Sequence, residues 1–355
     1  MTPARVLPLA APRRPYAHAE WGALIEAIRA ARRDQRPVVL MMGAHPIKLG
    51  LSRFLVDLID HHWITHLATN GAAIIHDYEL SLGVGTSEDV ARWIRVGQFG
   101  LWEEPGALNG VVSQAAERDE GLGEAIGRTI EEHRLPSRDL SLFAACWRNG
   151  IPATVHVGIG SDIIHAHESC DGAAWGQTSH TDFLIFAHTI SQLEGGVFLN
   201  VGSAVTGPEV YLKALSMARN RARQVDEPLH RFTTAVFDLV PLPSSYRQGP
   251  PGKDHPAYYY RPWKTILVRT VADGGRSFYF CGNHVDTMPT LWASLCDSRA
   301  AGRLEHNDEC HGEHDGDDGQ RDQADDHGVA SPAGSGRVTQ RGSGEGCRAD
   351  RRAGR

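Results

Sequence analysis

The sequence predicts an α/β fold with a doubly wound, mainly parallel sheet. Short apolar runs alternate with amphipathic segments between residues 20 and 295, and strands covered on both faces have this apolar composition. Such alternation is typical of parallel sheets with helices on both faces. Polar residues gather where apolar runs end, for example at Thr69 and Asn70. Ligands of such sheets bind at the carboxyl ends of the strands.

The predicted elements follow from periodicity. Segments with apolar residues at i, i+3, i+4 and i+7 predict helices, and short continuous apolar runs predict strands. The predicted helices cover 21–33, 50–62, 87–97, 181–193 and 208–224. The predicted strands cover 37–45, 63–71, 152–160, 195–202, 232–240 and 264–271.

The chain changes character near residue 296. We expect an N-terminal extension over 1–19, one domain over 20–295 and a disordered tail over 296–355. The tail has almost no large apolar residues, so it cannot bury enough surface to offset the entropy of ordering. Its abrupt onset also suggests translation out of frame, a hypothesis that resequencing of the locus would test.

Composition excludes several classes of protein. The net charge of -7 and the pI near 6.2 argue against nucleic acid or an anionic membrane as the main partner. No apolar run has the roughly 20 residues of a membrane helix, and the Pro-rich, Arg-rich N-terminus makes a poor signal peptide. Six scattered cysteines without a CxxC pair suggest reduced thiols in a cytoplasmic protein.

Glycine-rich turns give only a weak signal for a dinucleotide. "GLGEAIG" at 121–127 has one residue too many for GxGxxG and lies in a predicted helix. "GIGSDI" at 158–163 follows a predicted strand but lacks the third glycine. Taken alone, each motif is better explained by glycines that only allow the chain to turn than by a phosphate-binding loop.

A second cluster contains possible metal ligands. "HVGIGSDIIHAHESCDG" brings together His156, Asp162, His165, His167, Glu168 and Cys170, and imidazole, carboxylate and thiolate groups at this density are typical ligands of zinc or another transition ion. The sequence has no HExxH motif or paired cysteines to complete such a site. A polar active-site loop is therefore favoured over a metal-dependent hydrolase, and no metal is expected.

The aromatic segment "HPAYYYRPWKTILV" leaves two interpretations open for Lys264. The aromatic residues form half of a sheet face and Lys264 reaches water, or they desolvate Lys264 and lower its pKa so that its neutral amine attacks an imine or carbonyl. In the second interpretation Trp263 holds a cationic substrate against its ring. Spacing alone favours the first interpretation.

Residues 36–295 resemble the deoxyhypusine synthase family. "GLSRFLVDLIDHHWITHLATNGAAIIHD" resembles the family's Gly-Leu-Arg-Glu helix and the NAD-binding turn after it. "GIGSDII" resembles its Gly-Ser-x-Gly-Asp segment, "EGGVFLN" its Gly-Gly-Gly-Val-Val-Lys-His segment and "PWK" its Trp-Gly-Lys. "GNHVDTMPTLW" resembles its closing segment. The resemblance implies a Rossmann-like NAD-binding fold and a homotetramer.

The resemblance also implies roles for individual residues. Lys264 and His76 would be catalytic, and Asp162, Trp263 and Asn200 would bind substrate. The NAD-binding residues would be Thr69, Asn70, Gly71, Gly158, Gly195, Gly196 and Asn283.

Three departures affect the expected substrate. Ile75 and His76 replace a glutamate pair, Asn200 replaces a histidine, and the Trp–Lys spacing is one residue short, which on a strand would turn Lys264 to the other face unless a bulge compensates. We expect an NAD-dependent transferase that moves an aminobutyl-like group from a polyamine to an acceptor amine, such as a protein lysine, through an imine on Lys264. The alternatives are an NAD-binding protein or oxidoreductase with another substrate, and the metal-dependent hydrolase.

Overall fold

The computed structural model describes the backbone of residues 1–307 and the side chains of residues 1–296. The last helix, α13 (His284–Asn307), continues beyond the predicted domain boundary at 295. The remainder of the predicted tail lies outside the described residues. The N-terminal segment packs on the body, where the amide of Leu7 donates to the carbonyl of Gly50 at 2.9 Å.

Six parallel strands form one sheet in the order β3-β2-β1-β4-β5-β6. β1 lies at the centre, where Leu40 aligns with Leu67 of β2 and with Leu199 of β4. The strands are β1 (Val38–Met42), β2 (His66–Asn70), β3 (Ala153–His156), β4 (Val197–Val201), β5 (Thr233–Asp238) and β6 (Arg276–Cys281). The predicted doubly wound, parallel sheet is confirmed.

Helices connect the strands, and α1 spans the same residues, 21–33, that the apolar periodicity predicts. The longer helices are α1 (Trp21–Arg33), α3 (Ser52–Asp60), α4 (Gly71–Ser81), α7 (Leu108–Glu117), α8 (Leu122–Glu132), α10 (Gly172–Ser191), α11 (Thr206–Gln224) and α13. The shorter ones are η1 (Pro3–Arg5), α2 (His45–Lys48), α5 (Val90–Trp93), η2 (Ile94–Val96), α6 (Glu103–Gly106), η3 (Arg138–Leu140), α9 (Leu142–Arg148), η4 (Ile163–Ala166), η5 (Pro256–Tyr259), η6 (Trp263–Leu267) and α12 (Val268–Ala272).

The predicted strand over 264–271 is wrong. This segment forms the π-helix η6 followed by α12. Trp263, Ile266 and Leu267 are buried in one apolar cluster, and their i, i+3, i+4 spacing is that of a helix face. The last strand is instead β6, after the turn at Gly274, and the sequence prediction missed it.

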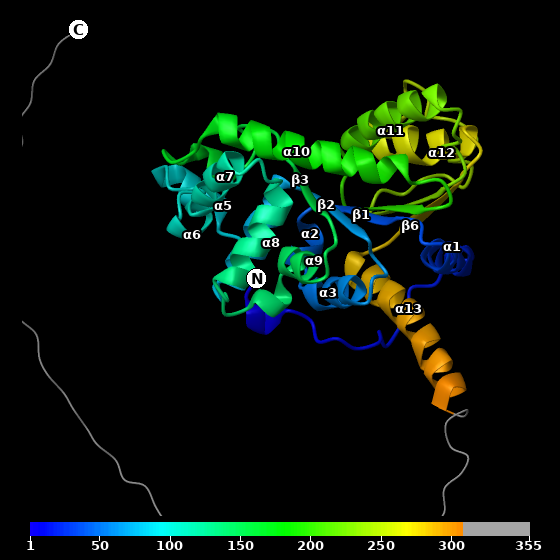
Figure 1. The fold of residues 1–355 in the computed structure, drawn as a ribbon, viewed down its shortest axis with the longest axis horizontal. Coiled ribbons are helices and arrows are strands. Elements are labelled where there is room, and N and C mark those ends of the chain that lie inside the picture. Colours follow the sequence, from blue (N-terminus) through cyan, green and yellow to red (C-terminus); the bar gives the residue numbers. More distant parts are fainter. Residues whose placement is uncertain (308–355) are drawn as a thin grey trace, which may run out of the picture. The chain divides into compact units, whose positions relative to one another are not determined.

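Alternating side chains of the strands divide the core into two parts. Leu40 and Met42 belong to one apolar cluster and Val39 and Met41 to the other, as expected for side chains that alternate across a sheet. Helices α1, α3, α4, α8, α9 and α13 pack in the first cluster, and α11 and η6 pack in the second. Figure 1 shows α10, α11 and α12 together on one side of the strands.

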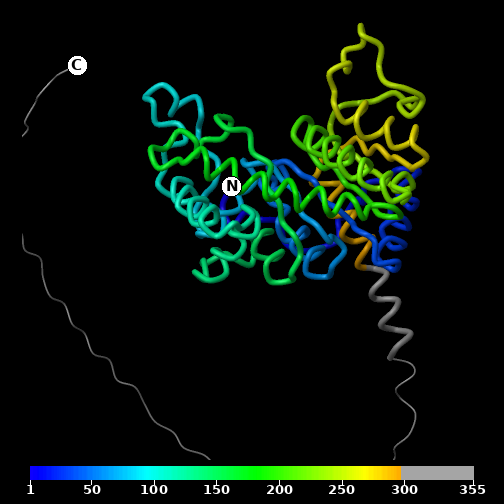
Figure 2. The backbone as a smooth tube through the Cα atoms, turned by 45° about the horizontal axis from the view of Figure 1, so that its top comes forward, coloured from blue at the N-terminus to red at the C-terminus, as the bar shows by residue number. Residues whose placement is uncertain are grey.

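The two halves of the sheet wind in opposite directions. From β1 the chain passes to β2 and β3 on one side, and then crosses through α10 to β4, β5 and β6 on the other. The order therefore reverses between β1 and β4. Figure 2 shows that the segment after α4, in cyan, and the segment between β5 and η6, in yellow-green, project on the same side of the molecule.

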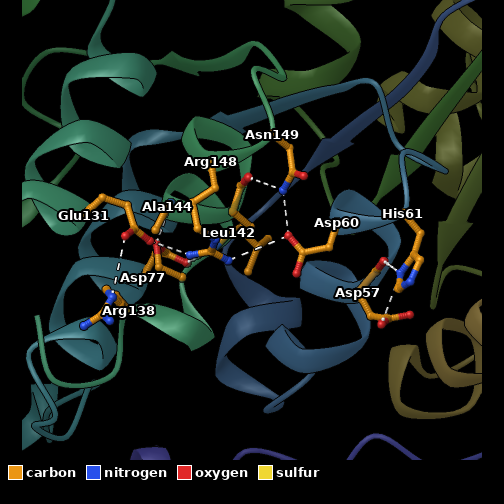
Figure 3. A network of polar contacts seen from close by, with 12 residues as sticks. Asp57, Asp60, His61, Asp77, Glu131, Arg138, Leu142, Ala144, Arg148 and Asn149 are labelled. Atoms are coloured by element: carbon orange, nitrogen blue, oxygen red, sulfur yellow. Dashed lines mark hydrogen bonds and ion pairs between the residues drawn. The ribbon is translucent and has the colours of Figure 1, made fainter. Parts of the chain in front are cut away.

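A polar network ties helices together on the α3 side of the sheet. Arg148 contacts Glu131 at 2.5 Å and Asp60 at 3.7 Å, and Asn149 donates to Asp60 at 2.7 Å. Figure 3 shows these side chains between α3, α8 and α9, with Asp77 of α4 beside them. The network joins α9 to α3 and α8, and α4 is attached to the start of α9 through Asp77, which accepts from the amide of Leu142.

Candidate functional site

Two glycines make a close backbone approach where the strand order reverses. A Cβ atom on Gly43, which follows β1, would lie 2.6 Å from the carbonyl oxygen of Gly202, which follows β4. Gly202 has φ +59°, and a Cβ atom there would lie 2.7 Å from Nε2 of His284. Only glycine fits both positions without a shift of the chain. Doubly wound sheets of this strand order bind dinucleotides in the crevice at this place.

Buried polar atoms without partners lie along the same edge of the sheet. Among the described residues, Oδ1 of Asn200, Nδ1 of His284 and Oγ1 of Thr69 are buried and accept or donate no hydrogen bond. Burial lowers the pKa of His284, and His45 lowers it further, while Asp238 acts in the opposite direction. Unsatisfied buried polar groups are rare in folded proteins. A polar ligand would satisfy them, so these residues fit a bound cofactor.

A cavity of about 630 Å³ lies beside this edge. Its walls come from α2, α4, the segment between α4 and α7, and the loop after β3. Three aromatic side chains line it, and the rings of two of them, Trp93 and Trp102, are 5.3 Å apart in an edge-to-face arrangement. Its charged and titratable lining residues are Lys48, His76, Glu79, Glu88, Glu104 and Asp162. Carboxylates outnumber the cations, so the cavity favours a positively charged ligand.

Asp162 lies in the cavity wall at the start of η4. Desolvation by burial raises its pKa, while His165 and Ser161 act in the opposite direction. The loop that carries it is folded back by Ser161, whose amide donates to the carbonyl of Gly158 at 2.9 Å. Asp162 lies against the end of β2, where a Cβ atom on Gly71 would come within 2.2 Å of its Oδ2.

His76 of α4 lines the same cavity. Its Nδ1 lies 2.5 Å from Oγ1 of Thr86, and the hydroxyl of Thr86 donates to Glu79. Nδ1 of His76 is also 3.8 Å from Oε2 of Glu79. The structure thus brings the predicted residues His76 and Asp162 to one cavity, together with Glu79 and Thr86.

The turn over 69–71 has the predicted strand–turn–helix geometry. β2 ends at Asn70 and α4 begins at Gly71. The Asn70 side chain accepts a hydrogen bond from the amide of Ala73 at 3.2 Å and so caps α4. Gly158, Asn200 and Asn283 also lie at or after the carboxyl ends of their strands. These residues therefore share one edge of the sheet.

Gly195 and Gly196 lie at the opposite edge. They precede β4, and in a parallel sheet all strands start at one edge. The five residues of β4 separate them from the carboxyl edge by about 16 Å. The amides of both already donate to backbone carbonyls, and a Cβ atom on Gly196 would lie 2.6 Å from the carbonyl of Pro37. The expectation that they border the same ligand as Gly71 is corrected: they let β4 approach the start of β1.

Lys264 and Trp263 are also separated from the cavity. They lie in η6, which packs on the other face of the sheet from α4, and neither lines the cavity. The Trp263 indole is buried and donates to the carbonyl of Tyr246 at 2.8 Å. Nζ of Lys264 lies 3.3 Å from the ring centroid of Tyr258. The expectation that they share a substrate site with Asp162 is therefore corrected.

The residues of the alternative metal site do not converge. His156 is buried beside Phe186 and Thr154, and burial lowers its pKa to about 3. His167 contacts the carbonyl of Gly100 at 2.9 Å. Over residues whose side chains are described, no group of three histidine, cysteine or acidic residues is arranged to hold a metal ion.

Sequence reasoning missed most of the cavity wall. The sequence pattern predicts only a helix over 87–97, although Glu88 and Trp93 of this segment line the cavity, together with Trp102 beyond it. Glu88 accepts hydrogen bonds from the amide of Gly100 at 2.8 Å and from the Trp102 indole at 2.9 Å. The alternation of acidic and aromatic residues over 88–104 was the available signal. Within the described part of the chain, no helix is long and apolar enough to cross a membrane.

Comparison with known proteins gives a likeness in fold only. No protein-family model matches the sequence, and no curated protein is similar to it. AgrE, solved as a ternary complex with ornithine and NAD+, has 16% identity and a TM-score of 0.46 over 81% of this chain and 35% of its own. ArgZ, an arginine dihydrolase from the ornithine–ammonia cycle in cyanobacteria, has 12% identity and a TM-score of 0.47 over 78% and 32%.

A third solved structure, of a candidate deoxyhypusine synthase from Entamoeba histolytica, has 10% identity and a TM-score of 0.42 over 78% of this chain and 87% of its own. This chain spans about a third of the length of the AgrE and ArgZ chains. Because the identities are this low and the TM-scores stay below 0.5, the activities of these proteins are not transferred to this one.

Proposed function

We propose that this protein is an NAD-dependent enzyme that oxidises a small, positively charged amine. The observation that supports it best is the pairing of two features at one edge of the sheet. One is the close backbone approach of Gly43 and Gly202 where the strand order reverses between β1 and β4, and the other is the acidic and aromatic cavity at the same edge.

The carboxyl edge between β1 and β4 would hold the cofactor. Gly43 and Gly202 put no side chains into these turns, so their backbone groups stay accessible to a phosphate, and Asn200 Oδ1 and His284 Nδ1 have no other partner among the described residues. Thr69, Asn70 and Gly71 lie at the same edge, on the β2 side. Bound there, NAD+ would supply a hydride acceptor.

The cavity would hold the amine. Asp162 and Glu79 offer carboxylates to an ammonium group, which gains charge-assisted hydrogen bonds. Trp93 and Trp102 offer ring faces that attract a cation and cover an aliphatic chain. Both carboxylates are partly withdrawn from water, which strengthens their attraction for a cation. His76 lines the same cavity and would exchange a proton with the amine nitrogen.

The expected group transfer through Lys264 is not included in this proposal. Lys264 belongs to the other face of the sheet, and no observation brings it to the amine. Oxidation of the amine needs only a cofactor bound at the β1–β4 edge and the cavity. Transfer of a fragment to an acceptor amine would need a further group in the cavity.

The experiment has two parts. Calorimetric titration with NAD+ and NADP+ should give a dissociation constant in the micromolar range or below, about -8 kcal/mol or stronger. Gly43→Ala should abolish binding because its Cβ atom would meet the carbonyl of Gly202. Gly176→Ala is the matched control, since Gly176 is exposed in α10 with nothing within 4 Å of a Cβ atom.

The second part is a panel of mono-, di- and triamines incubated with enzyme and NAD+, followed by NADH absorbance. Amine-dependent NADH formation is the expected result. Absence of binding to either cofactor would overturn the proposal. Binding without NADH formation from any amine would leave an NAD-binding protein, and the proposed activity would be wrong.

A further inference from the structure

We infer that Glu79 and Thr86 fix the tautomer of His76, so that its Nε2 is the base of the cavity and Thr86 is its positioning residue. The inference starts from a chain of three side chains. Thr86 Oγ1 lies between Nδ1 of His76, at 2.5 Å, and Oε2 of Glu79. All three line the cavity.

Proton counting sets the direction of this chain. An ionised carboxylate only accepts hydrogen bonds, and a hydroxyl group has one proton to donate. The Thr86 hydroxyl donates to Glu79, so its oxygen can only accept from the imidazole. Nδ1 of neutral His76 therefore carries the proton, and Nε2 carries the free electron pair.

Burial protects these hydrogen bonds from competition by water. Thr86 is 2% exposed, and the side chains of His76 and Glu79 are 16% and 11% exposed. Water has little access to break the chain, and the Thr86 backbone is fixed by hydrogen bonds with Met1 at 2.8 and 2.9 Å. Nε2 of His76 has no hydrogen-bond partner among the described residues and is the ring nitrogen left for a ligand.

The resulting step is a single proton transfer. An N–H bond of the substrate ammonium breaks, its electron pair stays on the amine nitrogen, and the proton forms an N–H bond with Nε2. The imidazolium ion keeps Nδ1–H donated to Thr86, and Glu79 stabilises its charge at 3.8 Å. The role as a base rests on the proposed amine oxidation, whereas the tautomer rests only on the hydrogen bonds.

The tautomer is measured without substrate. Protein labelled with ¹⁵N-histidine is recorded by long-range ¹H–¹⁵N NMR, and His76→Gln assigns the signals of His76. We expect the Nδ1–H tautomer in the parent protein and in Thr86→Ser, and loss of that preference in Thr86→Val. Thr178→Val is the matched control, because Thr178 is also buried but its hydroxyl bonds only within α10. An Nε2–H tautomer in the parent, or no change in Thr86→Val, would overturn the inference.

Kinetics give an independent readout. Thr86→Val should lower kcat about 10- to 100-fold, as losses of orienting partners do, and shift the acidic limb of the kcat profile against pH. Thr86→Ser should restore both. The other titratable groups at this cavity are Lys48, Glu79, Glu88, Glu104, Asp162 and the amino group of Met1. If no amine is oxidised, the proposed function fails and the NMR result still decides the tautomer.

Discussion

Gly71 and Asp162 are in direct contact across the end of β2: a Cβ atom on Gly71 would lie 2.2 Å from Oδ2 of Asp162. The contact joins the turn that opens α4 to the loop after β3. It leaves the Asp162 carboxylate in the cavity wall and allows no side chain at position 71 unless that carboxylate moves.

The first prediction concerns this contact. Gly71→Ala should displace the Asp162 carboxylate and weaken amine binding about 10-fold, the loss expected for one hydrogen bond to a charged group. The change in amine dissociation constant or KM measures it. The double variant Gly71→Ala/Asp162→Asn should be no weaker than Asp162→Asn, because both changes remove the same interaction. Fully additive losses would show that Gly71 acts elsewhere.

A second prediction concerns Asp162 and pH. Its pKa is raised by burial, so the carboxylate becomes protonated at a higher pH than an ordinary aspartate. As the pH is lowered, amine binding should therefore begin to weaken at a higher pH than it would with an exposed carboxylate. Binding measured from pH 7 to pH 4 tests this, and Asp162→Asn should bind weakly at every pH. A parent titration that follows an unshifted aspartate would contradict the assignment.

A third prediction concerns Asp77, which binds nothing in the cavity. It is 1% exposed, accepts hydrogen bonds from the Ser141 hydroxyl and the Leu142 amide, and so holds the start of α9. Burial raises its pKa from 3.8 to about 6. The native state then binds more protons than the unfolded state between these values, and the Asp77 contribution to stability falls as pH rises through this window.

Asp77→Asn removes that titration. The stability of the variant relative to the parent should increase between pH 4 and pH 6.5 by up to about 3 kcal/mol, the equivalent of about two pKa units. Urea unfolding at several pH values measures it. Asp171→Asn is the control, because Asp171 also caps a helix but is exposed. A pH-independent difference for Asp77→Asn would show that its native pKa is ordinary.

A fourth prediction separates Lys264 from the amine chemistry. Lys264→Ala should keep NAD binding and amine turnover within about twofold, and lose about 0.5–1 kcal/mol of stability with the Tyr258 contact. Borohydride added during turnover should trap no adduct on Lys264, as read by mass spectrometry. A trapped adduct there would restore the covalent route.

The last prediction compares the glycine that precedes β4, Gly196, with the glycine that follows it, Gly202. Gly196→Ala should lower stability, because its Cβ atom would meet the carbonyl of Pro37 at 2.6 Å, but the folded fraction should bind NAD+ like the parent. Gly202→Ala should lose NAD+ binding. Thermal unfolding and calorimetry on the same samples separate the effects. If folded Gly196→Ala loses affinity for the cofactor, Gly196 belongs to the cofactor site and its placement here is wrong.

Local patterns were sufficient for most of the scaffold. The segment over 21–33 has an apolar period that only a helix satisfies, and the apolar run containing Val38–Met42 is bounded by Pro37 and Gly43, which favours a short strand. The structure contains both elements. The segment over 264–271 failed because a short run of β-branched and apolar residues fits a strand or a buried helix equally well. Its packing on α11 and on the sheet decides between them.

The site depended much more on tertiary structure. The end of an apolar run pointed to Thr69, Asn70 and Gly71, because polar and small residues there mark the carboxyl end of a strand, and the family resemblance pointed to His76 and Asp162. The sequence gave no means of seeing that Lys48 and Thr86 join them, since these residues come from separate segments that meet only when α4 and the loop after β3 pack together. Lys264 was misplaced for the same reason: neighbours along the chain determine the type of an element, but the face of the sheet on which a helix packs depends on contacts between residues far apart in sequence.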